Sequence, residues 1–154
     1  MNTEPGLEYT IRRLISRACD LKHKRVHALL DELGLYPGQP FVLYALWDQD
    51  GLTQSELTKR LNRSPSTTTK KVQRMEKAGF VQRRSDDSDE RITRVFLTDA
   101  GREIRSAVEK MWHRFDRQIV AGFDAQELAL FHEFLLRVCQ NLENKAQSDK
   151  EEFR

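Results

Sequence analysis

The sequence predicts a mainly helical α+β fold, in which a helix-turn-helix and a two-stranded β-hairpin, or wing, are flanked by long helices, six helices in all. Three observations predict it. Apolar residues recur at helical spacing over most of the 154-residue chain. The tight turn Asn62-Arg63-Ser64-Pro65 separates two short helical segments. Two segments rich in β-branched, aromatic and basic residues then enclose a run of turn formers.

The first two helices follow from apolar spacing and chain breaks. Residues 7–33 have apolar side chains at helical spacing and no Pro or Gly, which predicts one long helix that stops at Gly34. After a break at 34–38, Pro40 suits the first turn of a short helix that reaches Trp47. This helix is apolar on most sides, so we expect it to be buried at the centre.

The two helices of the helix-turn-helix have recognisable start signals. Thr53-Gln54-Ser55-Glu56 has the form of a capping box, and the helix it opens runs to about Leu61. Ser64 is suited to cap the next helix, because a hydroxyl can accept a bond from a free backbone N–H. That second helix should end at Gly79, where a left-handed backbone costs Gly little.

The second helix of this pair has two different faces. One arc is suited to packing and holds Pro65, Thr68, Val72 and Met75. The opposite arc places small hydroxyls before cations, in the order Ser66, Thr67, Lys70, Lys71 and Arg74. Small residues let a helix approach base edges in the major groove, and the cations can reach phosphates or guanine edges. The pattern favours a DNA-reading helix over an ordinary amphipathic surface helix.

The wing and the C-terminal helices complete the prediction. Residues 80–84 and 91–97 should be strands joined by a turn at 85–90. Thr98 caps a long helix that ends at Gly122, and Asp124 with Glu127 opens a last helix. We expect the apolar stripe of the last helix to face inward: Leu128, Phe131, Phe134, Leu135, Val138 and Leu142.

The chain divides into four predicted regions. Residues 1–35 form an N-terminal dimerisation helix and residues 36–98 the DNA-binding domain. Residues 99–144 form C-terminal dimerisation helices, and residues 145–154 a polar tail.

Positive charge is concentrated in the predicted DNA-binding region. The net charge of the whole chain is only +2. Between Thr53 and Thr98, eleven Lys and Arg stand against six acids, so this segment has a net charge of +5 and the rest of the chain −3. A concentrated basic block is typical of a phosphate-binding surface, although such blocks are also found on ordinary solvated faces.

Several classes of protein are disfavoured. The sequence shows no signal peptide and no apolar run of bilayer length, so we expect a cytoplasmic protein that does not enter membranes. Cys19 and Cys139 are far apart, which suggests two free thiols. GxGxxG, P-loop, GxSxG and HExxH motifs are missing, so we predict neither an enzyme nor a cofactor. A winged module that binds protein would not need the cations of the second helix.

The order of these elements resembles the MarR (multiple antibiotic resistance regulator) family. The sharpest similarity is Asp89-Glu90-Arg91 followed by Val95-Phe96-Leu97-Thr98, which resembles the family pattern D-x-R with a downstream L-T. The segment from Ser64 to Gly79 and the Gly38-Gln39 stretch are also similar. The resemblance covers residues 7 to about 144.

The resemblance implies a transcriptional regulator, a repressor or less often an activator, that binds double-stranded DNA at a palindromic operator. It also implies a homodimer held by the first and the last two helices. It places Arg91 in the minor groove, steadied by Asp89; a narrow minor groove attracts Arg through its concentrated negative potential. An exposed Asp89–Arg91 ion pair is the alternative interpretation. With the second helix, the predicted DNA-binding residues are Ser64, Ser66, Thr67, Thr68, Lys70, Lys71, Arg74, Arg84, Asp89 and Arg91.

The resemblance also implies release from DNA by a small aromatic or lipophilic effector in a crevice between the dimerisation helices and the winged domain. Trp47 fits such a crevice and fits core packing equally well. Relatives that sense peroxide have a thiol at the position of Arg12, and Cys19 is displaced from it by two turns. Cys19, His23 and His27 have i, i+4 spacing, which suits zinc only with a further ligand, so we interpret them as a polar helix edge and predict no metal.

Overall fold

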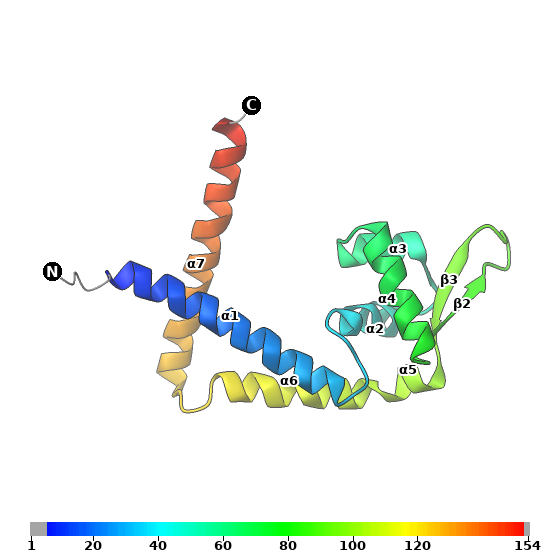
Figure 1. Cartoon of the computed structure of the whole chain (residues 1–154), viewed down its shortest axis with the longest axis horizontal. Helices are drawn as coiled ribbons and strands as arrows, with labels where there is room; N and C mark the ends of the chain where they lie inside the picture. Colours follow the sequence, from blue (N-terminus) through cyan, green and yellow to red (C-terminus); the bar gives the residue numbers. More distant parts are fainter. Residues whose placement is uncertain (1–5, 153–154) are drawn as a thin grey trace. The chain divides into compact units, whose positions relative to one another are not determined.

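The computed structural model describes residues 6–152, and the side chains of residues 6–144 (Figure 1). The chain divides into two compact units, the first ending at His113 and the second beginning at Arg114. Within the described part, none of the helices is both long enough and apolar enough to cross a membrane.

Four helices of the first unit match the sequence-based prediction closely. They are α1 (Leu7–Asp31), α2 (Gln39–Asp48), α3 (Gln54–Leu61) and α4 (Pro65–Lys77). Gly34 and Gly38, which bound the break between α1 and α2, both have positive φ. The core face of α2 is fully buried, as expected, through Val42, Leu43 and Leu46. Its other face is not buried, since Phe41 is 61% exposed.

The sheet has three strands rather than two. β2 (Val81–Ser85) and β3 (Thr93–Leu97) form the predicted hairpin, which extends from the helices in Figure 1. β1 (Leu52–Thr53) adds an antiparallel strand on the other side of β3, giving the order β1-β3-β2. This strand was not predicted, because two residues are too few for an alternating pattern. Leu52 pairs with Val95, so β1 fixes the start of α3 to the hairpin.

The helices and the sheet of this domain share one apolar core. α3, α4 and the strands contribute side chains that are at most 1% exposed: Leu52, Leu57, Val72, Met75, Val81 and Val95. The turn between α4 and β2 has the predicted geometry, since Gly79 is left-handed and the Phe80 N–H donates to the Met75 carbonyl at 3.0 Å. The hairpin is therefore packed directly against the helix-turn-helix.

The predicted helix after the wing is interrupted at one residue. α5 (Asp99–Glu103) and α6 (Arg105–Ile119) are separated only by Ile104. Helical bonding continues across it, because the Ile104 N–H donates to the Ala100 carbonyl and the Val108 N–H to the Ile104 carbonyl. Counting α5 and α6 together, the described chain has the six helices expected. Thr98 is the N-cap of α5, as predicted, and its hydroxyl accepts from the Gly101 N–H at 3.1 Å.

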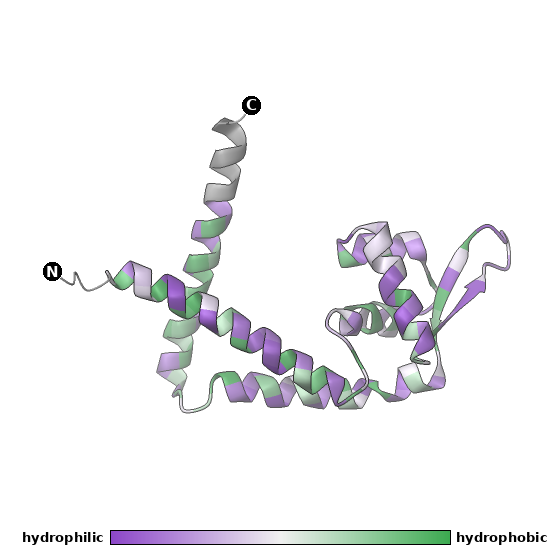
Figure 2. Ribbon diagram, in the orientation of Figure 1, coloured by the Kyte–Doolittle hydropathy of each residue, from purple (hydrophilic) through white to green (hydrophobic). Residues whose placement is uncertain are grey.

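The last helix, α7 (Ala125–Glu152), differs from the prediction in its burial. It begins with the expected capping box, in which Asp124 and Glu127 exchange bonds of 2.9 Å. Its apolar stripe does not face inward in the single chain, because Phe134 is 51% and Leu142 68% exposed. Figure 2 shows hydrophobic residues along both α7 and α1. Residues 145–152, assigned to a polar tail, continue α7; their side chains and residues 153–154 lie outside the described part.

Candidate nucleic-acid interface

The start of α4 presents a group of small hydroxyls. Ser64 is the N-cap, and its Oγ accepts from the Thr67 N–H at 3.3 Å. The same Oγ lies 2.8 Å from the Thr67 hydroxyl and 3.2 Å from the Ser66 hydroxyl. Ser64 and Ser66 are exposed, and Thr67 is half-buried. This end of the helix is thus small and rich in donors and acceptors, which suits contact with base edges.

The opposite face of α4 packs as the helical pattern predicts. Val72 and Met75 are fully buried. Thr68 is also fully buried, and its hydroxyl donates to the Ser64 carbonyl at 3.3 Å. The inclusion of Thr68 among the DNA-binding residues is therefore corrected, because a side chain inside the core cannot reach a duplex.

Three of the four cations of α4 were predicted to contact DNA, and they differ in their surroundings. Lys70 and Arg74 are exposed, and no acid of the described chain forms an ion pair with either. Lys71 is half-buried and its ammonium donates to the Pro37 carbonyl at 3.4 Å. Burial and the nearby guanidinium groups of Arg63 and Arg74 lower the pKa of Lys71. Of these three, Lys70 and Arg74 are thus more open to phosphate than Lys71.

Most cations of the wing are held by the protein itself. Arg83 forms a 2.8 Å ion pair with Glu76 of α4, and this pairing lowers the pKa of Glu76. The Arg84 guanidinium lies over the Phe96 ring, 5.4 Å from its centroid. Both arginines are exposed.

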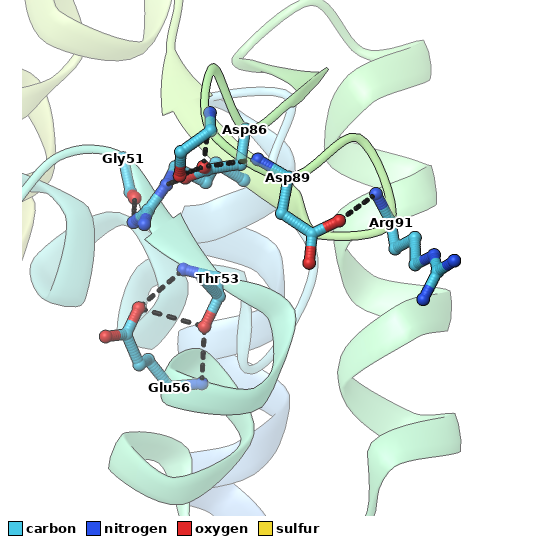
Figure 3. Close-up of polar contacts among 8 residues, drawn as sticks. Gly51, Thr53, Glu56, Asp86, Asp89 and Arg91 are labelled. Carbon is cyan, nitrogen blue, oxygen red and sulfur yellow. Dashed lines mark hydrogen bonds and ion pairs between the residues drawn. The ribbon is translucent and has the colours of Figure 1, made fainter.

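Arg91 lies in the loop between the strands, since β3 begins only at Thr93. Its backbone N–H donates to Asp89 Oδ1 at 3.0 Å, and Figure 3 shows its side chain extending away from Asp89. No acid of the described chain forms an ion pair with its guanidinium. Asp89 therefore holds the backbone of Arg91, and the alternative of an Asp89–Arg91 ion pair is not observed.

A cavity of about 560 Å³ lies among α2, α3 and α4. Phe41 and Tyr44 supply an aromatic wall, and Asp48 in its lining is paired with Arg60 at 2.8 Å. Arg63 and Lys71 also line it, and neither has an acid partner within the described side chains. This cavity was not predicted from the sequence. The available signal was the i, i+3 spacing of Phe41 and Tyr44 outside the core face of α2.

Other residues considered from the sequence have simpler surroundings. Trp47 does not line this cavity; its indole N–H donates to the Gly101 carbonyl at 2.8 Å, which favours the packing interpretation. Cys19, His23 and His27 are all exposed on α1. Among the described residues, no group of three or more His, Cys, Asp or Glu side chains is placed to hold a metal ion.

Comparison with known proteins identifies the family of this domain. The MarR family model matches residues 35–93. The Bacillus subtilis helix-turn-helix transcriptional regulator YwoH is 31% identical over 132 residues, which cover 83% of this chain and 96% of YwoH. A second B. subtilis regulator, YdgJ, is 35% identical over 103 residues, or 67% of this chain, but the match spans only 63% of YdgJ.

A solved structure supports the same assignment. The PcaV transcriptional regulator of Streptomyces coelicolor matches with a TM-score of 0.78 and 25% identity, covering 86% of this chain and 96% of PcaV. The family model matches only residues 35–93, whereas PcaV matches 86% of this chain. The similarity to PcaV therefore extends to the helices on both sides of residues 35–93. This chain therefore belongs to the MarR family of DNA-binding helix-turn-helix transcriptional regulators.

Proposed function

We propose that this regulator represses transcription by binding a palindromic operator as a homodimer, and that a small organic anion releases it. The family consists of transcriptional regulators rather than enzymes. The observation that supports the DNA contacts best is the distribution of unpaired cations. Lys70 and Arg74 on α4 and Arg91 on the wing have no acid partner among the described residues, whereas the other wing arginines are engaged within the protein. Acting on chromosomal DNA would place the protein in the cytoplasm.

Three kinds of DNA contact follow from this arrangement. Ser66 and Thr67 at the start of α4 would meet base edges in the major groove, and Lys70 and Arg74 would meet phosphates. Arg91 would enter the minor groove beside the major-groove site, where narrow A·T-rich stretches attract a guanidinium. A repressor of this kind blocks transcription by occupying its operator.

The homodimer is supported by apolar surface that the single chain leaves exposed. Each unit carries such a surface, and a monomeric protein seldom exposes this many large apolar side chains in continuous stretches. On α1 they are Leu7, Ile11, Leu14, Ile15 and Leu21, and on α7 they are Leu130, Phe131, Phe134, Leu135, Leu136 and Leu142. We propose that a second copy covers them, which would pair two winged domains for a palindromic site.

The effector is proposed from the chemistry of the cavity among α2, α3 and α4. Its volume is within the usual range for small-molecule sites. Phe41 and Tyr44 suit an aromatic or lipophilic body, and Arg63 with Lys71 suits a carboxylate. PcaV has been crystallised in complex with its natural ligand, so a fold of this kind can hold a ligand. Since Lys71 belongs to α4, an anion bound beside it would alter the charge that α4 presents to DNA.

The direct test measures binding to the DNA upstream of the protein's own gene, by fluorescence anisotropy, against a scrambled duplex. Arg91→Ala should weaken operator binding by about 1–3 kcal/mol, while Arg91→Lys should retain only part of the affinity, because a lysine keeps the charge but not the planar guanidinium. Light scattering should give a dimer at micromolar concentration for all three proteins. Equal operator affinity for Arg91→Ala and the parent would refute the wing contact, and a monomer would refute the palindromic operator.

A further inference from the structure

The turn at the tip of the wing is built around the carboxylate of Asp86. This residue follows β2 directly and is 9% exposed. Its Oδ1 accepts from the backbone N–H groups of Ser88 at 2.9 Å and Asp89 at 3.2 Å, and from the Ser88 hydroxyl. Its Oδ2 forms an ion pair with the Arg94 guanidinium. A single carboxylate thus holds the backbone at the start of the turn.

Arg94 links this carboxylate to the helix-turn-helix. Its Nη1 donates to the carbonyl of Gly51 at 2.9 Å, immediately before β1. A continuous series of contacts therefore runs from Gly51 through Arg94 and Asp86 to the backbone of Asp89. Gly51 is buried and left-handed, with the Phe96 ring 2.6 Å from where a Cβ would stand, so this end of the series is fixed by packing.

The same series ends at Arg91. Asp89, whose N–H bonds to Asp86, accepts the Arg91 N–H on its own side chain at 3.0 Å. The Ile92 N–H donates to the Asp89 carbonyl at 2.9 Å, and the Asp86 N–H donates to the Ile92 carbonyl at 2.8 Å, which closes the loop. The backbone of Arg91 is therefore held on one side by the Asp89 side chain, and on the other by backbone bonds of Ile92 with Asp89 and Asp86.

We propose that Asp86 and Arg94 are positioning residues for Arg91, which fix the wing tip relative to the helix-turn-helix so that Arg91 and α4 meet one duplex at the same time. The inference rests on the proposed DNA contact of Arg91. Asp86 and Arg94 act through the backbone and touch no nucleotide in this scheme. Pre-organisation of this kind matters because a loop that becomes ordered only on binding loses conformational entropy, and this loss weakens the affinity for DNA.

The charges of the pair agree with this role. Hydrogen bonds from the Ser88 hydroxyl and from Arg94 hold the pKa of Asp86 well below its ordinary value, and Asp86 raises the pKa of Arg94. Both groups are thus ionised at neutral pH. Arg94 is a wing cation whose charge is paired with Asp86 within the protein, whereas Arg91 has no acid partner among the described residues.

The sign of a substitution effect separates positioning from simple electrostatics. Removing an acid from a DNA-binding surface should strengthen binding to any duplex, because the acid repels phosphate. If Asp86 positions Arg91, Asp86→Asn should instead weaken operator binding. Asp87 is an exposed acid in the same turn, so Asp87→Asn is the matched control: it removes the same charge and leaves the contacts of Asp86 in place.

The experiment compares Asp86→Asn, Asp87→Asn, Arg91→Ala and the double variant Asp86→Asn/Arg91→Ala on a duplex from upstream of the protein's own gene, by fluorescence anisotropy. Arg91→Ala should weaken binding roughly 5- to 150-fold. Asp86→Asn should weaken it by an amount in the same range and no larger. Asp87→Asn should bind as tightly as the parent or more tightly. In the Arg91→Ala background, Asp86→Asn should add no further loss.

Hydrogen exchange on the DNA-free proteins provides a readout independent of affinity. Asp86→Asn should speed exchange of the Ser88 and Asp89 amides and leave the α4 amides unchanged, which also shows that the variant is folded. Unchanged operator binding by Asp86→Asn, or the same loss in the parent and Arg91→Ala backgrounds, would overturn the inference alone. Parent-like binding by Arg91→Ala would refute the proposed Arg91 contact and this inference with it.

Discussion

Arg74→Gln should reduce the salt dependence of DNA binding, because Arg74 is an exposed cation of α4 without an acid partner among the described residues. Each lost phosphate contact lowers the slope of log K against log[salt] by about 0.9. The proposed homodimer would carry two copies of Arg74, so the expected change is about 1.8. Between 50 and 200 mM salt, the affinity ratio of parent to variant should then shrink by about tenfold.

Lys71→Gln should change the slope less than Arg74→Gln does. The Lys71 ammonium is half-buried and bonded to the Pro37 carbonyl, so it is less free to reach a phosphate. The matched control is Lys24→Gln, which removes one exposed cation from α1.

The assay is fluorescence anisotropy on operator and scrambled duplexes at several salt concentrations. The Arg74→Gln change should be the same on both duplexes, since phosphate contacts carry no base sequence. A parent-like slope for Arg74→Gln would refute the assignment of Arg74 to phosphate. An equal change for Lys24→Gln would show that net charge, rather than position on α4, sets the slope.

Three further predictions concern base reading, stability and pH. Ser66→Ala and Thr67→Ala should alter which duplexes are selected from a randomised pool more than they alter affinity for scrambled DNA. Gly101→Ala should lower the free energy of unfolding in urea by about 1–3 kcal/mol or more, because its Cβ would lie 2.0 Å from the Phe80 carbonyl oxygen. The pKa of Asp86 is lower in the folded protein than the ordinary 3.8, so its ionisation stabilises the fold above that value, and this stabilisation is lost as the pH falls through the folded-state pKa. Acid unfolding of Asp86→Asn should therefore depend less steeply on pH than that of the parent.

The helix-turn-helix was predictable because its signals are local. The Thr53–Glu56 capping box and the Ser64 cap are formed by residues at most three positions apart, and both occur in the structure as expected. The buried arc of α4 was predictable for a related reason, since helical geometry fixes which positions share a face.

The errors came from features that local patterns do not determine. β1 has only two residues and depends on pairing with β3, which lies some forty positions away. Helical spacing indicated which residues of α7 form an apolar stripe, but the stripe is exposed in the single chain. Its burial therefore depends on what covers it. The position of Lys71 shows a third limit: the helix fixes where its Cβ lies, while the long side chain turns back to the Pro37 carbonyl.

The net charge of the DNA-binding region conceals how its cations are used. Four of its six acids make contacts within the domain: Glu56 caps Thr53, Glu76 pairs with Arg83, Asp86 pairs with Arg94, and Asp89 accepts the Arg91 N–H. These acids are therefore engaged with particular partners and do not weaken the surface uniformly. The positive potential offered to a duplex then comes mainly from cations without acid partners, and Lys70, Arg74 and Arg91 are such residues in the described chain. Consider two variants with the same net charge, one with an acid moved beside Arg74 and one with that acid moved to α1. The variant with the acid beside Arg74 should consequently bind DNA more weakly.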